Sequence, residues 1–154
     1  MTRPNGDGGS AVVEFVTLAV LLMVPVIYLV MAVGRVQAAA FAVEGASREA
    51  ARSMATSPDD ATGSRRAATA VDLALSDQGF GGPGEPAPLV RAECSKSPCA
   101  LPESLVRVTV ELEVVLPGVP AFLDGVIPTR VPVRAQGVAV ADRFAEQDPQ
   151  AQQP

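Results

Sequence analysis

The chain of 154 residues has no histidine, no tryptophan and only two cysteines, and these absences exclude several kinds of chemistry. Without histidine there is no Ser-His-Asp triad or Cys-His dyad, and most zinc sites are excluded. Ser-Lys and paired-carboxylate arrangements need no histidine, but Lys96 is the only lysine and lies in the Cys94–Cys99 loop, and no catalytic constellation is recognisable. The sequence therefore predicts a protein that is not an enzyme, with no metal site and no cofactor.

The charge of the chain is acidic rather than basic, with a net value of −5. Adjacent basic residues occur only at Arg65 and Arg66, and the only tyrosine, Tyr28, lies inside an apolar run. A nucleic-acid interface usually needs a basic face and exposed aromatic side chains. We therefore expect no nucleic-acid partner.

The longest apolar run, Ala11 to Val33, has 23 residues and no charge after Glu14. As a helix it covers roughly 34 Å, enough to cross a bilayer. It shows no polar stripe, and its central Pro25 is tolerated better in a membrane helix, with a kink, than in a soluble one. The run is expected to be a transmembrane helix that is apolar on every face.

A cleaved secretory signal is the main alternative for this run. Such a signal has a shorter apolar region, followed by a cleavage site with small residues. A site near Ala38-Ala39-Ala40 is conceivable, but it falls inside a strong helical pattern. The orientation of the helix in the membrane is only weakly indicated, because the positive charge of Arg3 before the span is nearly balanced by that of Arg35 after it.

Glu14 is the unusual residue of this segment, because it follows two glycines at the start of the apolar run "DGGSAVVEF". A carboxylate deep in a bilayer costs about 2.5–3.5 kcal/mol on insertion scales. Either Glu14 lies at the level of the lipid headgroups, or it needs a positively charged partner.

The helical pattern continues past the membrane segment to Ala55. It is rich in alanine, the best helix former, and Glu44 and Arg48 form a favourable i,i+4 pair. Residues 57–60, "SPDD", end it in a turn. The small side chains of this extension either pack on a globular head or provide a surface for close helix packing in an assembly.

The remaining residues predict a small head with one helix and two strands. Asp59 or Asp60 caps a helix to Ser76, and residues 79–88 form a loop rich in glycine and proline. Strands are predicted at 105–116, where apolar and polar residues alternate, and at 130–142, with a bulge or bend at Gly137.

Three further features belong to this head. Cys94 and Cys99 are expected to form a short-loop disulfide in an oxidising compartment, with two free thiols as the alternative. An apolar connection either folds under the sheet or forms a contact patch, made of Phe122, Leu123, Val126 and Ile127. The composition of the tail, 143–154, predicts disorder.

The predicted fold class is α+β, a long N-terminal transmembrane helix that continues into a small head with a short antiparallel sheet. The expected segments are a leader, the membrane helix, its extension, the head and the tail, at 1–9, 10–33, 34–56, 57–142 and 143–154.

The start of the chain resembles a type IV prepilin, in which a polar leader ends in glycine and a glutamate follows five residues later. "GSAVVEF" and "GRVQAAAFAVEGASREAARSMA" are similar to TadE-like pseudopilins of tight-adherence (Tad/Flp) pilus systems, in the form found in high-GC Gram-positive bacteria. The resemblance covers residues 8–55 well and the head only in outline. The chain departs from many relatives in having no proline soon after the glutamate.

The resemblance implies cleavage by a membrane prepilin peptidase between Gly9 and Ser10, on the cytoplasmic side, with the head extracytoplasmic. It also implies a role as a minor pilin or pseudopilin in pilus assembly. Its partners would be other pilin subunits and the Tad membrane machinery. The alternatives are a signal-anchored extracytoplasmic binding protein and a factor secreted after cleavage near Ala40.

Overall fold

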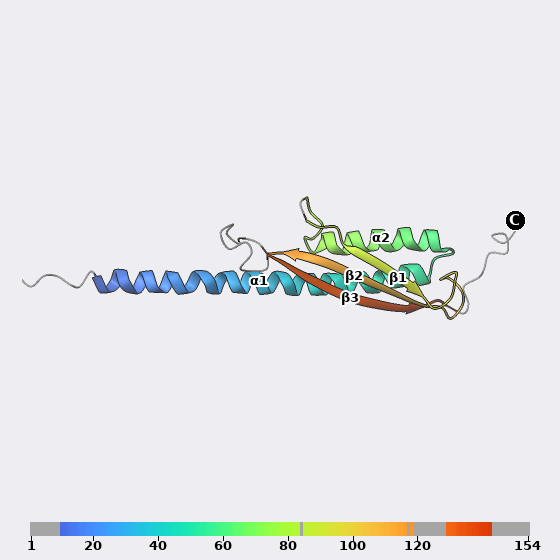
Figure 1. The fold of residues 1–154 in the computed structure, drawn as a ribbon, viewed down its shortest axis with the longest axis horizontal. Coiled ribbons are helices and arrows are strands. Elements are labelled where there is room, and N and C mark those ends of the chain that lie inside the picture. The colour runs from blue at the N-terminus through green and yellow to red at the C-terminus, as the bar shows by residue number, and fades with distance from the viewer. Residues whose placement is uncertain (1–9, 84, 117, 119–128, 143–154) are drawn as a thin grey trace, which may run out of the picture. The chain divides into compact units, whose positions relative to one another are not determined.

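A computed structural model describes residues 10–83, 85–116, 118 and 129–142 of the chain. It contains helix α1 (Ser10–Ala55), helix α2 (Asp60–Asp77) and strands β1 (Leu89–Cys94), β2 (Leu105–Val115) and β3 (Arg130–Val140) (Figure 1). The predicted α+β class, with a long apolar N-terminal helix and an antiparallel sheet, is confirmed.

The chain divides into two compact units, and the boundary falls inside α1, between Gly34 and Arg35. The first unit holds the apolar part of α1, which is long and apolar enough to cross a membrane. The second holds the remainder of α1 together with α2 and the sheet. Residues 35–56 of the predicted extension therefore lie in the same unit as the head, while Gly34 lies in the first unit.

The three strands form one antiparallel sheet in the order β1-β2-β3. β2 lies in the centre of the sheet. The alternation of apolar and polar residues along it predicts which side chains are buried: Val106, Val108, Val110, Leu112 and Val114. β1 was not predicted, since residues 89–94 alternate weakly and are mostly exposed. It pairs with β2 from Leu89↔Glu111 to Cys94↔Val106.

The core of the head lies between the sheet and two helical faces (Figure 1). From α1 it takes mainly alanines at helical spacing, together with Val43 and Met54. From α2 it takes Ala67, Val71 and Leu75. The alanine-rich extension therefore packs onto the head, which favours the first of the two interpretations given to it. The predicted Glu44–Arg48 pair is present on the exposed side of α1.

Of the bulge or bend predicted at Gly137, the bulge is wrong. β3 pairs one-to-one with β2 from Val115↔Arg130 to Leu105↔Val140, and Gly137 lies opposite Val108 without interruption. Gly137 is buried because it faces the backbone of α1, and a Cβ built on it would lie 2.1 Å from the carbonyl oxygen of Ser47. The apparent change of phase arises because Val138 and Val140 are exposed on the outer face of the sheet.

Helix α2 begins and ends with recognisable caps. The Asp59 side chain accepts a hydrogen bond from the Thr62 N–H at 2.8 Å, so Asp59 is the cap of the two candidates, Asp59 and Asp60. At the other end Gly79 has a φ of 75°, and the Phe80 N–H donates to the Leu75 carbonyl at 2.9 Å. This is a Schellman closure, which a glycine at that position favours, and it brings Phe80 into the core.

Candidate functional site

The first candidate site is the apolar part of α1 around Glu14. The helix contains Ser10 and continues through Glu14 and across Pro25. Residues 11–27 are all exposed within the chain. Exposed apolar side chains on every turn are unfavourable in water, and a bilayer removes that cost.

Glu14 is exposed, and it forms no hydrogen bond or ion pair with any residue that the structure describes. The hydroxyl of Thr17, one turn further on, donates to the carbonyl of Val13 at 2.7 Å and is therefore satisfied within the helix. A carboxylate on this segment thus needs a partner from another molecule, from the chain outside the described residues, or from the headgroup layer.

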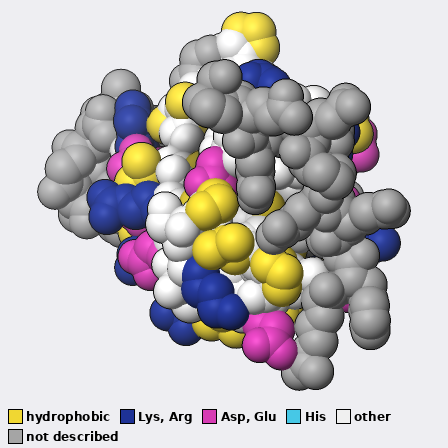
Figure 2. Space-filling model, turned by 90° about the vertical axis from the view of Figure 1, so that its right-hand side faces the viewer, with side chains coloured by type: hydrophobic (Ala, Val, Ile, Leu, Met, Phe, Trp, Pro, Cys, Tyr) yellow, Lys and Arg dark blue, Asp and Glu magenta, His cyan; other side chains and the backbone are white. Residues whose placement is uncertain are grey.

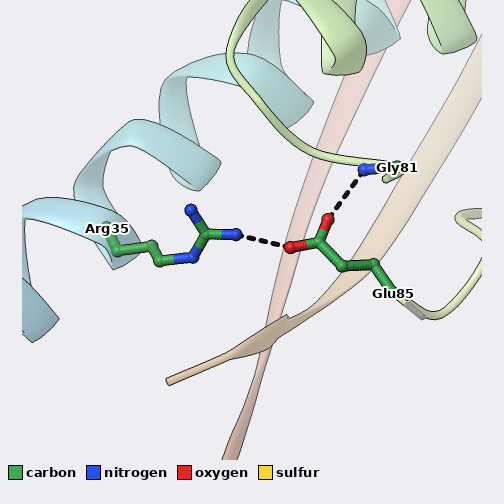
Figure 3. Close-up of polar contacts among 3 residues, drawn as sticks. All are labelled: Arg35, Gly81 and Glu85. Atoms are coloured by element: carbon green, nitrogen blue, oxygen red, sulfur yellow. Dashed lines mark hydrogen bonds and ion pairs between the residues drawn. The ribbon is translucent and has the colours of Figure 1, made fainter. Parts of the chain in front are cut away.

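The second candidate lies at the start of the head, where Arg35 meets the 79–88 loop (Figure 3). A guanidinium nitrogen of Arg35 lies 2.5 Å from Glu85 Oε1, and the guanidinium stacks over the Phe80 ring with its carbon 4.9 Å from the ring centre. The other carboxylate oxygen of Glu85 accepts from the Gly81 N–H at 2.8 Å.

This second cluster has a structural role. Arg35 is the first charge after the apolar run, and Glu85 is the only charge in its loop. Both side chains are partly buried, so their pairing satisfies charges that would otherwise be costly, and it fastens the loop to α1. The pair was not predicted. Its only sequence signal is that each of these charges stands alone in its segment.

A shallow hollow lies between α2 and the same loop, lined among others by Thr69, Asp72, Phe80 and Glu85. Glu85 is already paired with Arg35, and the chain has no histidine to activate the Thr69 hydroxyl. Within the described residues no cluster of His, Cys, Asp or Glu could hold a metal ion. We assign no role to this hollow.

The two cysteines are joined, with an S–S distance of 2.05 Å and Cα atoms 5.3 Å apart. The loop between them also contacts α2, because the Cys99 N–H donates to Asp60 Oδ1 at 2.8 Å. Asp59 caps the helix and Asp60 holds the disulfide loop, so the two adjacent carboxylates have separate roles. From the sequence, either acid could be expected to cap the helix, and the contact of Asp60 with the disulfide loop was not predicted.

Two predicted sites lie outside the described residues. They are Gly9, on one side of the predicted cut, and the apolar patch of Phe122, Leu123, Val126 and Ile127. Ser10, on the other side of the cut, is the first described residue of α1.

On the face of the molecule shown in Figure 2, the acidic and basic side chains of the described residues are interspersed with apolar ones. No family model, curated protein or solved structure matches this chain.

Proposed function

We propose that this protein is a TadE-like pseudopilin, a membrane-anchored minor subunit that acts in the assembly of a Tad/Flp-type pilus. The observation that carries the proposal is Glu14, a carboxylate without a described partner at the start of an apolar helix. The prepilin-like spacing of Gly9 and Glu14 supports it.

The chemistry of Glu14 follows from cleavage after Gly9. Cleavage creates a free α-amine on Ser10, and Ser10 and Glu14 stand four residues apart on the same helix. When subunits pack, the amine of one pairs with the carboxylate of another, which removes the cost of both charges in the bilayer. The pair also fixes the register of the assembly, since any other register leaves a charge unpaired.

The proposed topology places the amino terminus in the cytoplasm and the head outside the membrane. Prepilin peptidase would cut on the cytoplasmic side, and the Cys94–Cys99 disulfide supports an oxidising compartment for the head. The partners would be the peptidase, the bilayer, other pilin or pseudopilin subunits and the Tad membrane machinery.

The proposal is tested by changing Glu14 in the native host and measuring pilus assembly. Glu14→Gln keeps the size of the side chain and favours insertion, but it removes the charge. We expect Glu14→Gln to insert normally and to abolish assembly, while Glu14→Asp retains part of it. Val13→Gln is the matched control, because it places the same amide one residue away and leaves Glu14 intact.

Normal assembly with Glu14→Gln would contradict the proposal and would favour a signal-anchored binding protein with no pilus role. Alkaline carbonate extraction of the same cells tests the anchor. A chain that is released by carbonate has lost the 11–33 helix, as expected for a factor secreted after cleavage near Ala40.

A further inference from the structure

The two edge strands of the sheet differ in how they are held. β3 packs against the core through Val133, Ala135 and Ala139, and its Gly137 meets the backbone of α1. β1 has no buried side chain, and of its residues only Cys94, the last, packs against the core. One edge of the sheet is therefore fixed by the helices, whereas the other depends mainly on its pairing with β2.

The inward side of β1 shows the difference most clearly. Val90 pairs with Val110 of β2, and directly paired residues of an antiparallel sheet point to the same face. Val110 is fully buried, yet Val90 is 37% exposed. Ala92, paired with the buried Val108, is exposed as well. The helices thus cover β2 but leave β1 largely uncovered, so β1 adds few buried apolar contacts to the head.

Two fastenings hold β1 in addition to its pairing with β2. Just before the strand, the carboxylate of Glu85 pairs with the guanidinium of Arg35 on α1 (Figure 3). At the end of the strand, Cys94 is bonded to Cys99, whose N–H donates to Asp60 of α2. One fastening is an ion pair and the other is a covalent bond, so each can be removed without the other.

We propose that β1 is a strap that opens as a local unit while β2, β3 and both helices stay folded, with the ion pair and the disulfide as its two fastenings. Proteins open locally where few apolar side chains are buried and backbone hydrogen bonds lie near solvent, and the edge strand β1 meets both conditions. Opening frees the backbone groups of β2 that face β1, and a free strand edge can pair with another strand. The inference does not depend on the proposed function.

The test is hydrogen exchange of the full chain in detergent, followed by mass spectrometry of peptides from β1 and β3. The Ser95 N–H, just past β1, donates to the Leu105 carbonyl at 2.9 Å, so by alternation the amides of Arg91 and Glu93 face β2. Alternate amides of β3 face β2 in the same way and are the reference. We expect the β1 peptide to exchange about tenfold faster than that of β3, or more, because local opening needs less free energy than unfolding of the head.

Urea distinguishes local opening from unfolding of the whole head. Local opening exposes little surface, so exchange in β1 should respond weakly to urea below the unfolding transition, whereas exchange in β3 should rise steeply. Equal rates in the two strands, or an equal response to urea, would mean that β1 opens only with the whole head, and would overturn the proposal.

Two variants test the fastenings one at a time. Glu85→Gln should speed exchange in β1 roughly tenfold, as loss of a charge-assisted hydrogen bond predicts, and leave β3 unchanged. Cys94→Ser combined with Cys99→Ser should act in the same direction. Glu49→Gln is the matched control, at an exposed acid of α1. A variant that leaves exchange in β1 unchanged would overturn its fastening, and equal acceleration of β1 and β3 would overturn local opening.

Discussion

At Gly137 the sheet lies directly against the backbone of α1. A methyl group there would lie 2.1 Å from the Ser47 carbonyl oxygen and 2.6 Å from the Arg48 nitrogen. These are backbone atoms, so they cannot turn aside as a side chain does. Strand and helix would have to separate, and the buried valines of β2 would lose contact with α1.

We therefore expect Gly137→Ala to lower the free energy of unfolding of the head by about 1–3 kcal/mol, the usual cost of overpacking. Gly45→Ala is the matched control, because its Cβ would meet nothing within 4 Å and alanine favours a helix over glycine. Urea unfolding of the full chain in detergent measures both. Equal stabilities of Gly137→Ala and wild type would show that the contact is looser than described.

Asp59 makes the stability of α2 depend on pH. The N–H and the hydroxyl of Thr62 both donate to its carboxylate and lower its pKa below the ordinary value, which desolvation opposes only in part. A group whose pKa is lowered on folding stabilises the folded state above its unfolded pKa, and this contribution is lost as the pH falls through the folded pKa.

We accordingly expect Asp59→Ala to lower the thermal midpoint of the head at neutral pH, with the difference from wild type narrowing below about pH 4. Thermal unfolding followed by circular dichroism from pH 7 to pH 2.5 measures the difference. Asp59→Asn keeps a capping oxygen without a titrating charge, so its midpoint should change less with pH. A difference that stays constant over this range would contradict the role of the Asp59 charge.

At the scale of elements, the sequence predicted α1, α2, β2 and β3 with nearly their observed bounds. Their signals are strong because each has either a clear periodicity or a capping residue. β1 has neither: it is an edge strand whose side chains are mostly exposed, and its place is fixed by pairing with β2. Likewise, Gly137 was misread because a glycine in a strand marks either a bulge or a close backbone approach, and sequence does not distinguish the two.

The candidate sites likewise differ in whether a local sequence pattern reveals them. Glu14 was identified from sequence, because a charge in an apolar run is conspicuous by itself. The Arg35–Glu85 pair was not, because its members are 50 residues apart and meet only through the fold. A pair made by long-range contact leaves no local pattern.

The Cys94–Cys99 loop links β1 to the start of α2. In the chain-entropy account, closing so short a loop stabilises by about 2 kcal/mol. We expect reduction, or replacement of both cysteines by serine, to lower the stability by this amount. Unfolding of wild type with and without reductant measures it, and the double variant should not respond to reductant. A reductant effect that persists in the double variant would exclude the disulfide as its cause.

The Arg35–Glu85 pair should control the mobility of the 79–88 loop. Glu85→Gln can still accept from the Gly81 N–H, but it loses the charge that Arg35 pairs with. We expect faster proteolysis in this loop for Glu85→Gln, by roughly fivefold or more, if a charged hydrogen bond contributes about 1.5 kcal/mol. Glu49→Gln is a control at an exposed acid outside the loop, and equal cleavage of both variants would argue against the pair.

At the scale of the whole molecule, the chain joins two units whose surfaces differ in composition. Residues 10–34 expose apolar side chains on every turn, while the head buries an ordinary core against the second part of α1. The first unit is long and apolar enough to cross a membrane, and Glu14 is the one charge within its apolar run. The proposed pseudopilin role accounts for both, since cleavage creates the positive charge that Glu14 lacks.

The measurement that tests this account most directly is the intact mass of the protein isolated from its native membrane. The account predicts a chain that begins at Ser10, shorter than the full sequence by residues 1–9 and with the Cys94–Cys99 bond formed. A mass that corresponds to the full-length chain, or to a chain beginning near Ala40, would contradict it.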